Sequence, residues 1–185
     1  MSSNSIQKIL VIIVSRIGDT LLTTPAIESI SRHYQNSKIT VLAHPKRYSV
    51  LQHLAFVNHV GAISKNNAIW KGWFGKKYDL AFVYGYDKSL VLYALRTSKR
   101  VIAFKQSNSK IDNKLYKVAE FPSSKDMHFV NKFMALPEAI GIQGYNQRLS
   151  MSLTKNDKLF ADNILNKYKL SKKLLIGIQA VSFPT

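Results

Sequence analysis

The sequence lacks cysteine and is poor in acidic residues. Its 185 residues include no cysteine and only 10 Asp and Glu, against 27 Lys and Arg. Without cysteine the chain has no disulfide, no thiolate zinc site and no cysteine nucleophile. The shortage of acidic residues leaves a formal net charge of +17. Such a charge indicates an anionic partner: nucleic acid, a lipid headgroup surface, or an acidic or phosphorylated substrate.

Long apolar runs are missing too. The longest, ILVIIV at residues 9–14, is much shorter than the roughly 20 residues that cross a bilayer as a helix. Arg16 and Asp19 follow this run at once, and no small-residue cleavage site comes after it, so it makes a poor signal peptide. We therefore expect a cytoplasmic protein that at most lies peripherally against the cytoplasmic face of the inner membrane.

Short apolar runs alternate with longer amphipathic ones along the chain. The predicted strands are residues 8–14, 38–43, 59–64, 79–85 and 100–104, and the predicted helices are 24–35, 47–55, 67–76, 88–97, 126–140 and 154–169. Strands separated by helices indicate right-handed βαβ crossovers, and uninterrupted apolar runs are typical of strands buried on both sides. The sequence therefore predicts an α/β fold, a Rossmann-like parallel sheet with helices on both faces.

The end of the sequence predicts a second domain. Thr154 and Asp157 have the spacing of a capping box at the start of the last predicted helix. A new apolar run at residues 174–179 follows and is predicted to be a strand. We expect residues 1–170 to form one domain, and residues 171–185 to be the first strand and loop of a second, incomplete α/β domain.

A polar corner, SRIGD at residues 15–19, follows the first predicted strand. Open parallel sheets bind ligands beyond the carboxyl ends of their strands, which is where this corner is expected. Neither G-x-G-x-x-G nor a Walker A motif is present. Gly18 permits a tight turn or a close approach to a ligand. Asp19 has two interpretations: a carboxylate held by the free amides of a helix N-terminus, or a general base at the mouth of a ligand cleft.

Every predicted strand is followed by a positively charged side chain. These strand-end cations are Arg16, Lys46, Arg47, Lys65, Lys88 and Lys105. Because the carboxyl ends of parallel strands meet at one edge, the cations are suited to hold a sugar acid or a phosphate. The alternative is chance, since loops are polar and the chain is rich in Lys and Arg.

The stretch IWKGWFGKKY at residues 69–78 interleaves four aromatic residues with three lysines. This pattern suits an interface with anionic lipid. The alternative, which we favour, is an ordinary helix that buries Trp70, Trp73 and Phe74 in the core.

The five histidines have no metal-binding spacing, so no metal site is predicted.

Three segments resemble glycosyltransferase family 9, the lipopolysaccharide heptosyltransferases. Residues 8–45, KILVIIVSRIGDTLLTTPAIESISRHYQNSKITVLAHP, resemble the family's N-terminus, with its S-x-I/L-G-D corner and later T-x-P-A. Residues 76–104 are similar to a later segment in which a Tyr-Asp pair opens a strand. Residues 127–142 are similar to a His-initiated helix that closes on Ile-Gly. The resemblance extends over about residues 8–185.

This resemblance implies the N-terminal, acceptor-binding half of a GT-B glycosyltransferase, whose C-terminal half binds the nucleotide-sugar. The implied reaction is inverting transfer from an ADP-heptose type donor onto lipopolysaccharide core, with no cofactor and no obligatory metal. Asp19 matches the aspartate proposed as the base, and Ser182 lies where the donor phosphate site begins. The residues expected to contact the acceptor are Ser15, Arg16, Gly18, Lys46, Arg47, Lys88 and Lys105.

The length of the chain departs from that family, whose members need a further domain of comparable size. We therefore expect the 185-residue chain alone to have little or no activity, as a truncated form. Two alternatives remain at this stage: a non-catalytic remnant, and a basic module that binds nucleic acid or an anionic surface. A nucleic-acid reader would need a continuous basic stripe or aromatics on an exposed sheet, and the sequence has neither pattern.

Overall fold

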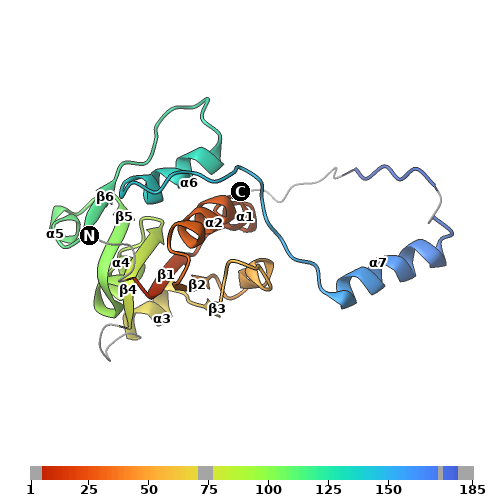
Figure 1. Ribbon diagram of the computed structural model, residues 1–185, viewed down its shortest axis with the longest axis horizontal. Coiled ribbons are helices and arrows are strands. Elements are labelled where there is room, and N and C mark those ends of the chain that lie inside the picture. Colours follow the sequence, from red (N-terminus) through yellow and green to blue (C-terminus); the bar gives the residue numbers. More distant parts are fainter. Residues whose placement is uncertain (1–5, 71–76, 171–172, 179–185) are drawn as a thin grey trace. The chain divides into compact units, whose positions relative to one another are not determined.

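The computed structural model describes residues 6–70, 77–170 and 173–178. The chain divides into two compact units, residues 1–152 and 153–185. The first unit contains a parallel sheet with the strand order β3-β2-β1-β4-β5-β6 (Figure 1). The strands are β1 (Lys8–Ile13), β2 (Lys38–Ala43), β3 (His59–Ala62), β4 (Tyr78–Tyr84), β5 (Ser98–Phe104) and β6 (Lys117–Ala119). This is the strand order of the doubly wound dinucleotide-binding folds, so the predicted fold class is confirmed.

Helices cover both faces of the sheet. The helices of the first unit are α1 (Ile17–Leu22), α2 (Thr24–His33), α3 (Lys65–Trp70), α4 (Lys88–Thr97), α5 (Ser109–Asp112) and α6 (Phe129–Glu138). Helices α2 and α6 pack on one face, and α3, α4 and α5 pack on the other. Within β1, alternate side chains enter the two cores, Ile9 and Val11 on the α2 side and Leu10 and Ile12 on the α4 side. The uninterrupted apolar run thus follows from burial on two sides.

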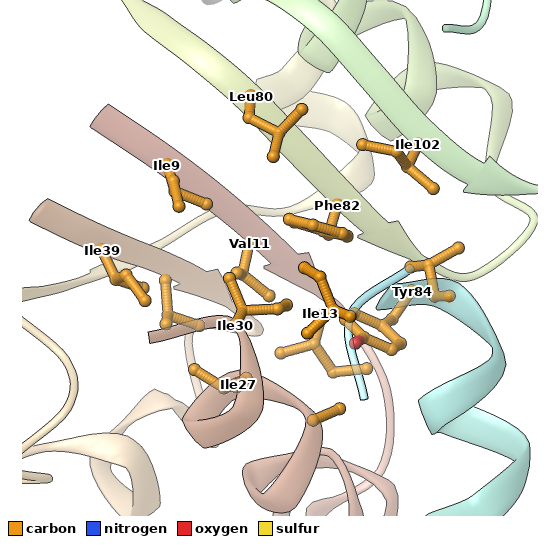
Figure 2. Close-up of a cluster of buried hydrophobic side chains, with 14 of the residues drawn as sticks. Ile9, Val11, Ile13, Ile27, Ile30, Ile39, Leu80, Phe82, Tyr84 and Ile102 are labelled. Atoms are coloured by element: carbon orange, nitrogen blue, oxygen red, sulfur yellow. The ribbon is translucent and has the colours of Figure 1, made fainter. Parts of the chain in front are cut away.

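The core beside α2 is centred on the middle strands β1 and β4. Val11, Phe82 and Tyr84 meet Ile27 and Ile30 of α2 there (Figure 2). Phe82 is completely buried, and Tyr84 packs edge-on against the rings of neighbouring phenylalanines. This close-packed layer holds the carboxyl ends of β1 and β4 in fixed positions.

Tyr84 carries an unsatisfied polar atom in that core. Its hydroxyl has no hydrogen-bond partner among the described residues, and burial raises the pKa of the phenol. An unpaired buried hydroxyl costs about 1–3 kcal/mol.

We expect Tyr84→Phe to raise the free energy of unfolding by about 1 kcal/mol, measured by urea denaturation. Tyr116→Phe, which alters a half-exposed phenol, is the control and should change little; a destabilised Tyr84→Phe would mean that the hydroxyl is satisfied.

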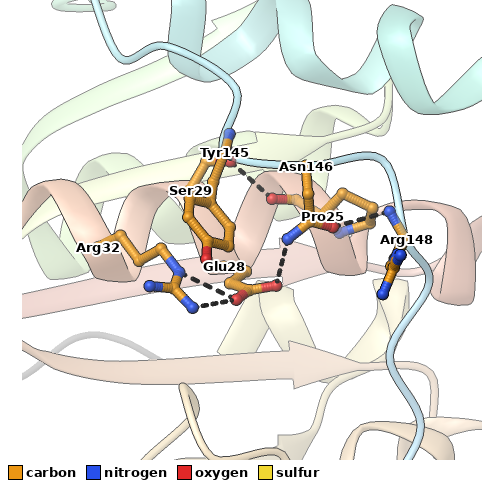
Figure 3. A network of polar contacts seen from close by, with 7 residues as sticks. All are labelled: Pro25, Glu28, Ser29, Arg32, Tyr145, Asn146 and Arg148. Atoms are coloured by element: carbon orange, nitrogen blue, oxygen red, sulfur yellow. Dashed lines mark hydrogen bonds and ion pairs between the residues drawn. The ribbon is translucent and has the colours of Figure 1, made fainter.

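A strap formed by residues 143–152 returns across α2 (Figure 3). The amide of Tyr145 donates to Ser29 Oγ at 3.0 Å, and Asn146 Nδ2 donates to Glu28 Oε2 at 3.2 Å. Glu28 also pairs with Arg32, whose guanidinium lies 3.5 Å from the centroid of the Tyr145 ring. The strap therefore fixes the position of α2, which follows α1 and the corner after β1.

Most predicted elements are confirmed, with shifted ends. The helix predicted at 47–55 is a 3₁₀ helix over Tyr48–Leu51 only, and the helix predicted at 126–140 is α6. Of the helix predicted at 67–76, the structure has α3, while residues 71–76 lie outside the described residues. Helices α1 and α5 and strand β6 were not predicted. These three elements are six residues or shorter, too short to give a clear hydrophobic period.

The second unit contains α7 (Lys155–Lys167), which begins with the predicted capping box of Thr154 and Asp157. The strand predicted at 174–179 is wrong for residues 174–178, which have no regular structure. A strand needs a hydrogen-bonded neighbour, and the described part of this unit offers none. That residues 171–185 begin a second domain stays a prediction. None of the described helices has the length and apolar content to cross a bilayer.

Candidate active site

The strand order reverses between β1 and β4, and the candidate site lies at that point. Ile13 and Tyr84 are paired neighbours at the carboxyl ends of these strands. The corner at residues 15–19 and the loop at residues 85–88 therefore start side by side, where open sheets bind ligands. Gly85 has φ +136°, a conformation that side chains disfavour. Glycine is thus required by the backbone at Gly85, a residue that the sequence analysis did not single out.

Asp19 lies in the first turn of α1, and its carboxylate is held by a side chain. Asp19 Oδ2 accepts a hydrogen bond from Ser15 Oγ at 2.5 Å. The N-cap of α1 is Arg16, which makes no side-chain capping bond. Among the described residues, no backbone amide donates to the Asp19 carboxylate. The half-buried carboxylate therefore does not have the geometry of a helix cap, and it keeps lone pairs for a ligand.

Arg47 braces the same corner from the turn after β2. Its Nη1 donates to the carbonyl oxygen of Ser15 at 2.7 Å, across 32 positions of the sequence. The turn itself is fixed because the amides of Arg47 and Tyr48 both donate to the carbonyl of His44. A guanidinium has five N–H donors, so Arg47 can hold Ser15 and still offer donors to an anion. This bracing role was not predicted, because no local pattern couples residues so far apart.

His44 accepts a hydrogen bond at Nδ1 from the amide of Lys46, at 3.2 Å. Burial, followed by the positive charges of Arg47 and Lys46, lowers the pKa of His44 below its ordinary value of 6.5. The unfolded chain therefore binds more protons than the folded one as the pH falls below about 6.5, and stability is lost in that window.

His44→Asn removes this titration and keeps an acceptor near the Nδ1 position. Between about pH 8 and pH 5 we expect the melting temperature of the wild type to fall further than that of His44→Asn. His53→Asn, at an exposed position with φ +62° that asparagine tolerates, retains His44 and should follow the wild type. Parallel melting curves of wild type and His44→Asn would contradict a lowered pKa.

Two of the strand-end cations are engaged in ion pairs. Lys65 Nζ lies 2.9 Å from Asp87 Oδ2, and Lys105 Nζ lies 2.9 Å from Glu120 Oε1. The Glu120 carboxylate raises the pKa of Lys105. The first pair joins the starts of α3 and α4, and the second joins the ends of the neighbouring strands β5 and β6. The charges of Lys65 and Lys105 are therefore partly compensated within the protein.

The other predicted acceptor contacts keep their charges available. Arg16, Lys46 and Lys88 are exposed, and in the described part of the chain none of them makes an ion pair. Gly18 does not have a left-handed backbone, and a Cβ there would meet no atom within 4 Å. The backbone therefore does not require a glycine at Gly18, and contact of Gly18 with a ligand stays a prediction.

Two further residues shape the site without having been predicted. Asp87 accepts from the Ser89 amide at 3.1 Å and so caps α4; its place before the predicted helix at 88–97 is a signal that could have identified it. Gln106 is buried, and its Nε2 donates to the carbonyls of Phe104 and Gly85. Nothing in the sequence around Gln106 indicates that its side chain would connect the ends of β4 and β5 through these hydrogen bonds.

Several predicted residues lie elsewhere. Ser182, Trp73 and Phe74 are outside the described residues. The expectation that Trp70 is buried is wrong: 81% of its surface is exposed, and Ala68 is the residue of α3 that enters the core. Within residues 6–70, 77–170 and 173–178, no three His, Cys, Asp or Glu side chains are placed to hold a metal ion.

Comparisons with known proteins give the fold. No family model and no curated protein matches the sequence. Among solved structures, a family 9 glycosyltransferase from Veillonella parvula matches 89% of the chain at 15% identity and a TM-score of 0.78. The E. coli ADP-heptose lipopolysaccharide heptosyltransferase II matches 90% at 18% identity and a TM-score of 0.65. E. coli heptosyltransferase WaaC with ADP matches 78% at 16% identity and a TM-score of 0.60.

The chain spans about half the length of each of these structures, 51%, 52% and 50% respectively. The resemblance noted in the sequence and the likeness in three dimensions therefore point to the same group of proteins. At identities this low the likeness establishes the architecture and not the reaction. The chain has the α/β, Rossmann-like fold found within solved family 9 glycosyltransferases and heptosyltransferases.

Proposed function

We propose that the protein acts in an inverting glycosyltransferase, which moves a heptose or a related sugar from a nucleotide-sugar onto lipopolysaccharide core. The carrying observation is the Asp19 carboxylate at the strand-order reversal, held by Ser15 and not by the amides of its own helix. A carboxylate with free lone pairs at the carboxyl edge of the sheet is suited to accept a proton from a bound hydroxyl.

The proposed transfer needs one catalytic group from this half of the protein, the Asp19 carboxylate. The acceptor oxygen attacks the anomeric carbon from the face opposite the nucleotide, and Asp19 takes the hydroxyl proton. The bond from the anomeric carbon to the diphosphate oxygen breaks, and the diphosphate leaves with that electron pair. One carboxylate is enough, because cations and helix amides stabilise the leaving group. A second carboxylate, as in glycosidases, has no role in this transfer.

The proposed substrates rest on the site and on the structural neighbours. Arg16, Lys46 and Lys88 surround the strand ends with uncompensated positive charge, which suits an acceptor that carries sugar acids or phosphates. Two neighbours were solved with ADP and with ADP-2-deoxy-2-fluoro heptose, which supports an ADP-sugar donor. We propose that the donor binds a second α/β domain, and that no metal is required.

The nucleic-acid alternative has less support. An exposed sheet with stacking aromatics is one route to single-stranded RNA, and both faces of this sheet are covered by helices.

Titration with ADP separates the two halves of the proposed site. The 185-residue chain alone is expected to bind ADP weakly by isothermal titration calorimetry, whereas the chain joined to a donor domain should bind ADP and release it from ADP-heptose when lipopolysaccharide core is added. Tight ADP binding by the 185-residue chain would contradict the proposal that the donor binds a second domain. Absence of transfer by a complete, folded protein that binds ADP would contradict the proposed reaction.

A further inference from the structure

Helix α6 contains a lysine that the folded chain buries. Lys132 is only 8% exposed, and among the described residues no other charged side chain is buried to this degree. Its ammonium group makes no ion pair and no hydrogen bond with any described residue. Lysines are almost never buried unless a partner balances their charge. The described part of the chain therefore supplies no counter-ion for Lys132.

The position of Lys132 makes its charge unfavourable for the fold. Burial removes water from the charged group. Lys132 is the fourth residue of α6, and helical side chains point back toward the N-terminal end, where partial positive charge gathers. Two aromatic rings offset part of this cost, because Nζ lies 4.8 Å from the ring centroid of Phe129 and 5.9 Å from that of Phe121. A residue that weakens the fold in this way is typical of a functional site.

Exposed aromatic rings adjoin the lysine. The Lys132 ammonium is not one of the enclosed polar atoms that lack a partner, so it reaches the protein surface. Phe129 is 48% exposed, and Tyr86, whose ring centroid lies 6.4 Å from that of Phe121, is 59% exposed. Aromatic rings held in a packed cluster offer flat apolar surfaces. The combination of such surfaces with one cation suits a sugar ring that carries an acidic group.

This cluster lies at the carboxyl edge of the sheet. Tyr86 and Phe121 each stand two positions after the last residue of a strand, β4 and β6 respectively. Helix α6 contacts β4 and also α1, the helix that carries Asp19. Glu120, the carboxylate whose charge acts on Tyr86, is paired with Lys105 at 2.9 Å. The cluster and Asp19 therefore belong to the same edge of the domain.

We propose that Lys132, Tyr86 and Phe129 form a binding site for a sugar that carries a carboxylate. The ammonium pairs with the carboxylate, and the two exposed rings contact the apolar face of the sugar. One ammonium balances the single charge of a carboxylate, whereas a phosphate monoester carries a charge of about −1.5 to −2. The role of this site rests on the proposed function: the bound sugar is the acidic unit of the acceptor, next to the unit whose hydroxyl Asp19 deprotonates.

Saturation-transfer difference NMR with the 185-residue chain measures binding of a sugar acid directly. The probe is methyl glucuronide, and the comparison ligands are methyl glucoside, which is neutral, and glucose 6-phosphate. The wild type is expected to bind methyl glucuronide about tenfold more tightly than methyl glucoside, and more tightly than glucose 6-phosphate.

Variants locate the binding. Lys132→Met keeps an apolar side chain without the charge and should raise the dissociation constant for methyl glucuronide about tenfold. Lys132→Arg restores the charge and should stay within about threefold of the wild type. Tyr86→Ala should weaken the binding of methyl glucuronide and methyl glucoside alike. Lys158→Met, at an exposed position of α7, is the matched control and should leave binding unchanged.

Thermal unfolding separates a binding role from a structural one. Without ligand, Lys132→Met is expected to raise the melting temperature by about 2–4 °C, because it removes a buried, unpaired charge. Lys158→Met should leave the melting temperature unchanged. The same substitution at Lys132 is thus expected to stabilise the protein and to abolish its preference for the acidic sugar.

Four results would overturn the site: no binding of methyl glucuronide to the wild type, equal binding by Lys132→Met, a preference for glucose 6-phosphate, or a lower melting temperature of Lys132→Met with unchanged binding. The last result would assign Lys132 to the fold alone. The probes involve no nucleotide-sugar and no transfer is measured, so these results leave the proposed reaction untouched. Conversely, a complete protein that binds methyl glucuronide at Lys132 but transfers no sugar would contradict only the reaction.

Discussion

Asp19→Asn is expected to lower the turnover of the complete transferase by roughly 10²–10⁴-fold. Asparagine has nearly the same size and can still accept the hydrogen bond from Ser15 Oγ, but its amide cannot take a proton from the acceptor hydroxyl. The Asp19 carboxylate makes no other hydrogen bond among the described residues, so the free energy of unfolding should change by less than about 1 kcal/mol. Release of ADP from the donor in the presence of acceptor is the measurement.

Two further variants make this result specific. Asp126→Asn changes an exposed carboxylate in the loop between β6 and α6 and should leave turnover unchanged. Ser15→Ala removes the donor that orients the Asp19 carboxylate, so a smaller loss of turnover is expected. Equal turnover of wild type and Asp19→Asn would reduce Asp19 to a structural residue and remove the basis of the proposed mechanism.

Phe82→Ala is expected to destabilise the first unit by about 3–5 kcal/mol. Phe82 lies in β4, between β1 and β5, and its ring is completely buried between the sheet and the layer of α2 and α6. Truncation removes most of the ring from a close-packed layer whose neighbours can collapse only in part. Domains of this kind unfold with about 5–15 kcal/mol, so the variant should lose a large part of its stability.

Urea denaturation followed by far-ultraviolet circular dichroism measures this loss. Phe160→Ala, which truncates a phenylalanine that is 69% exposed on α7, should change the unfolding free energy by less than about 0.5 kcal/mol. Similar small effects of both substitutions would mean that Phe82 is not at the centre of the core. Phe82→Leu, which keeps an apolar side chain of intermediate size, should lie between the wild type and Phe82→Ala.

The sequence determined the central strands and the helices between them. Strands β1 and β4 are read from uninterrupted apolar runs, because a strand covered on both faces must be apolar at successive positions. The capping box before α7 and the proline at the start of α2 are local signals, since each satisfies or avoids backbone groups within one helical turn. The corner with Asp19 was also identified from a local signal, because it is a polar segment directly after a buried strand.

Local patterns could not find the elements that depend on neighbours. Strand β6 has three residues, of which Ala119 alone is buried, and it forms because β5 offers free backbone groups beside it. The run at residues 174–178 has more strand character, yet it forms no strand in the described part of its unit. Strand formation requires a partner as well as a suitable sequence.

The tertiary structure decided how the site is arranged. Charge in the sequence marks every strand end alike, but only the fold pairs Lys65 with Asp87 and Lys105 with Glu120 and leaves Lys46 and Lys88 without such partners among the described residues. The fold also turns Trp70 outward and brings Arg47 to the carbonyl of Ser15. The physical reason is range: periodicity, capping and turn chemistry act over a few residues, whereas these contacts join side chains that meet only after the sheet has been assembled.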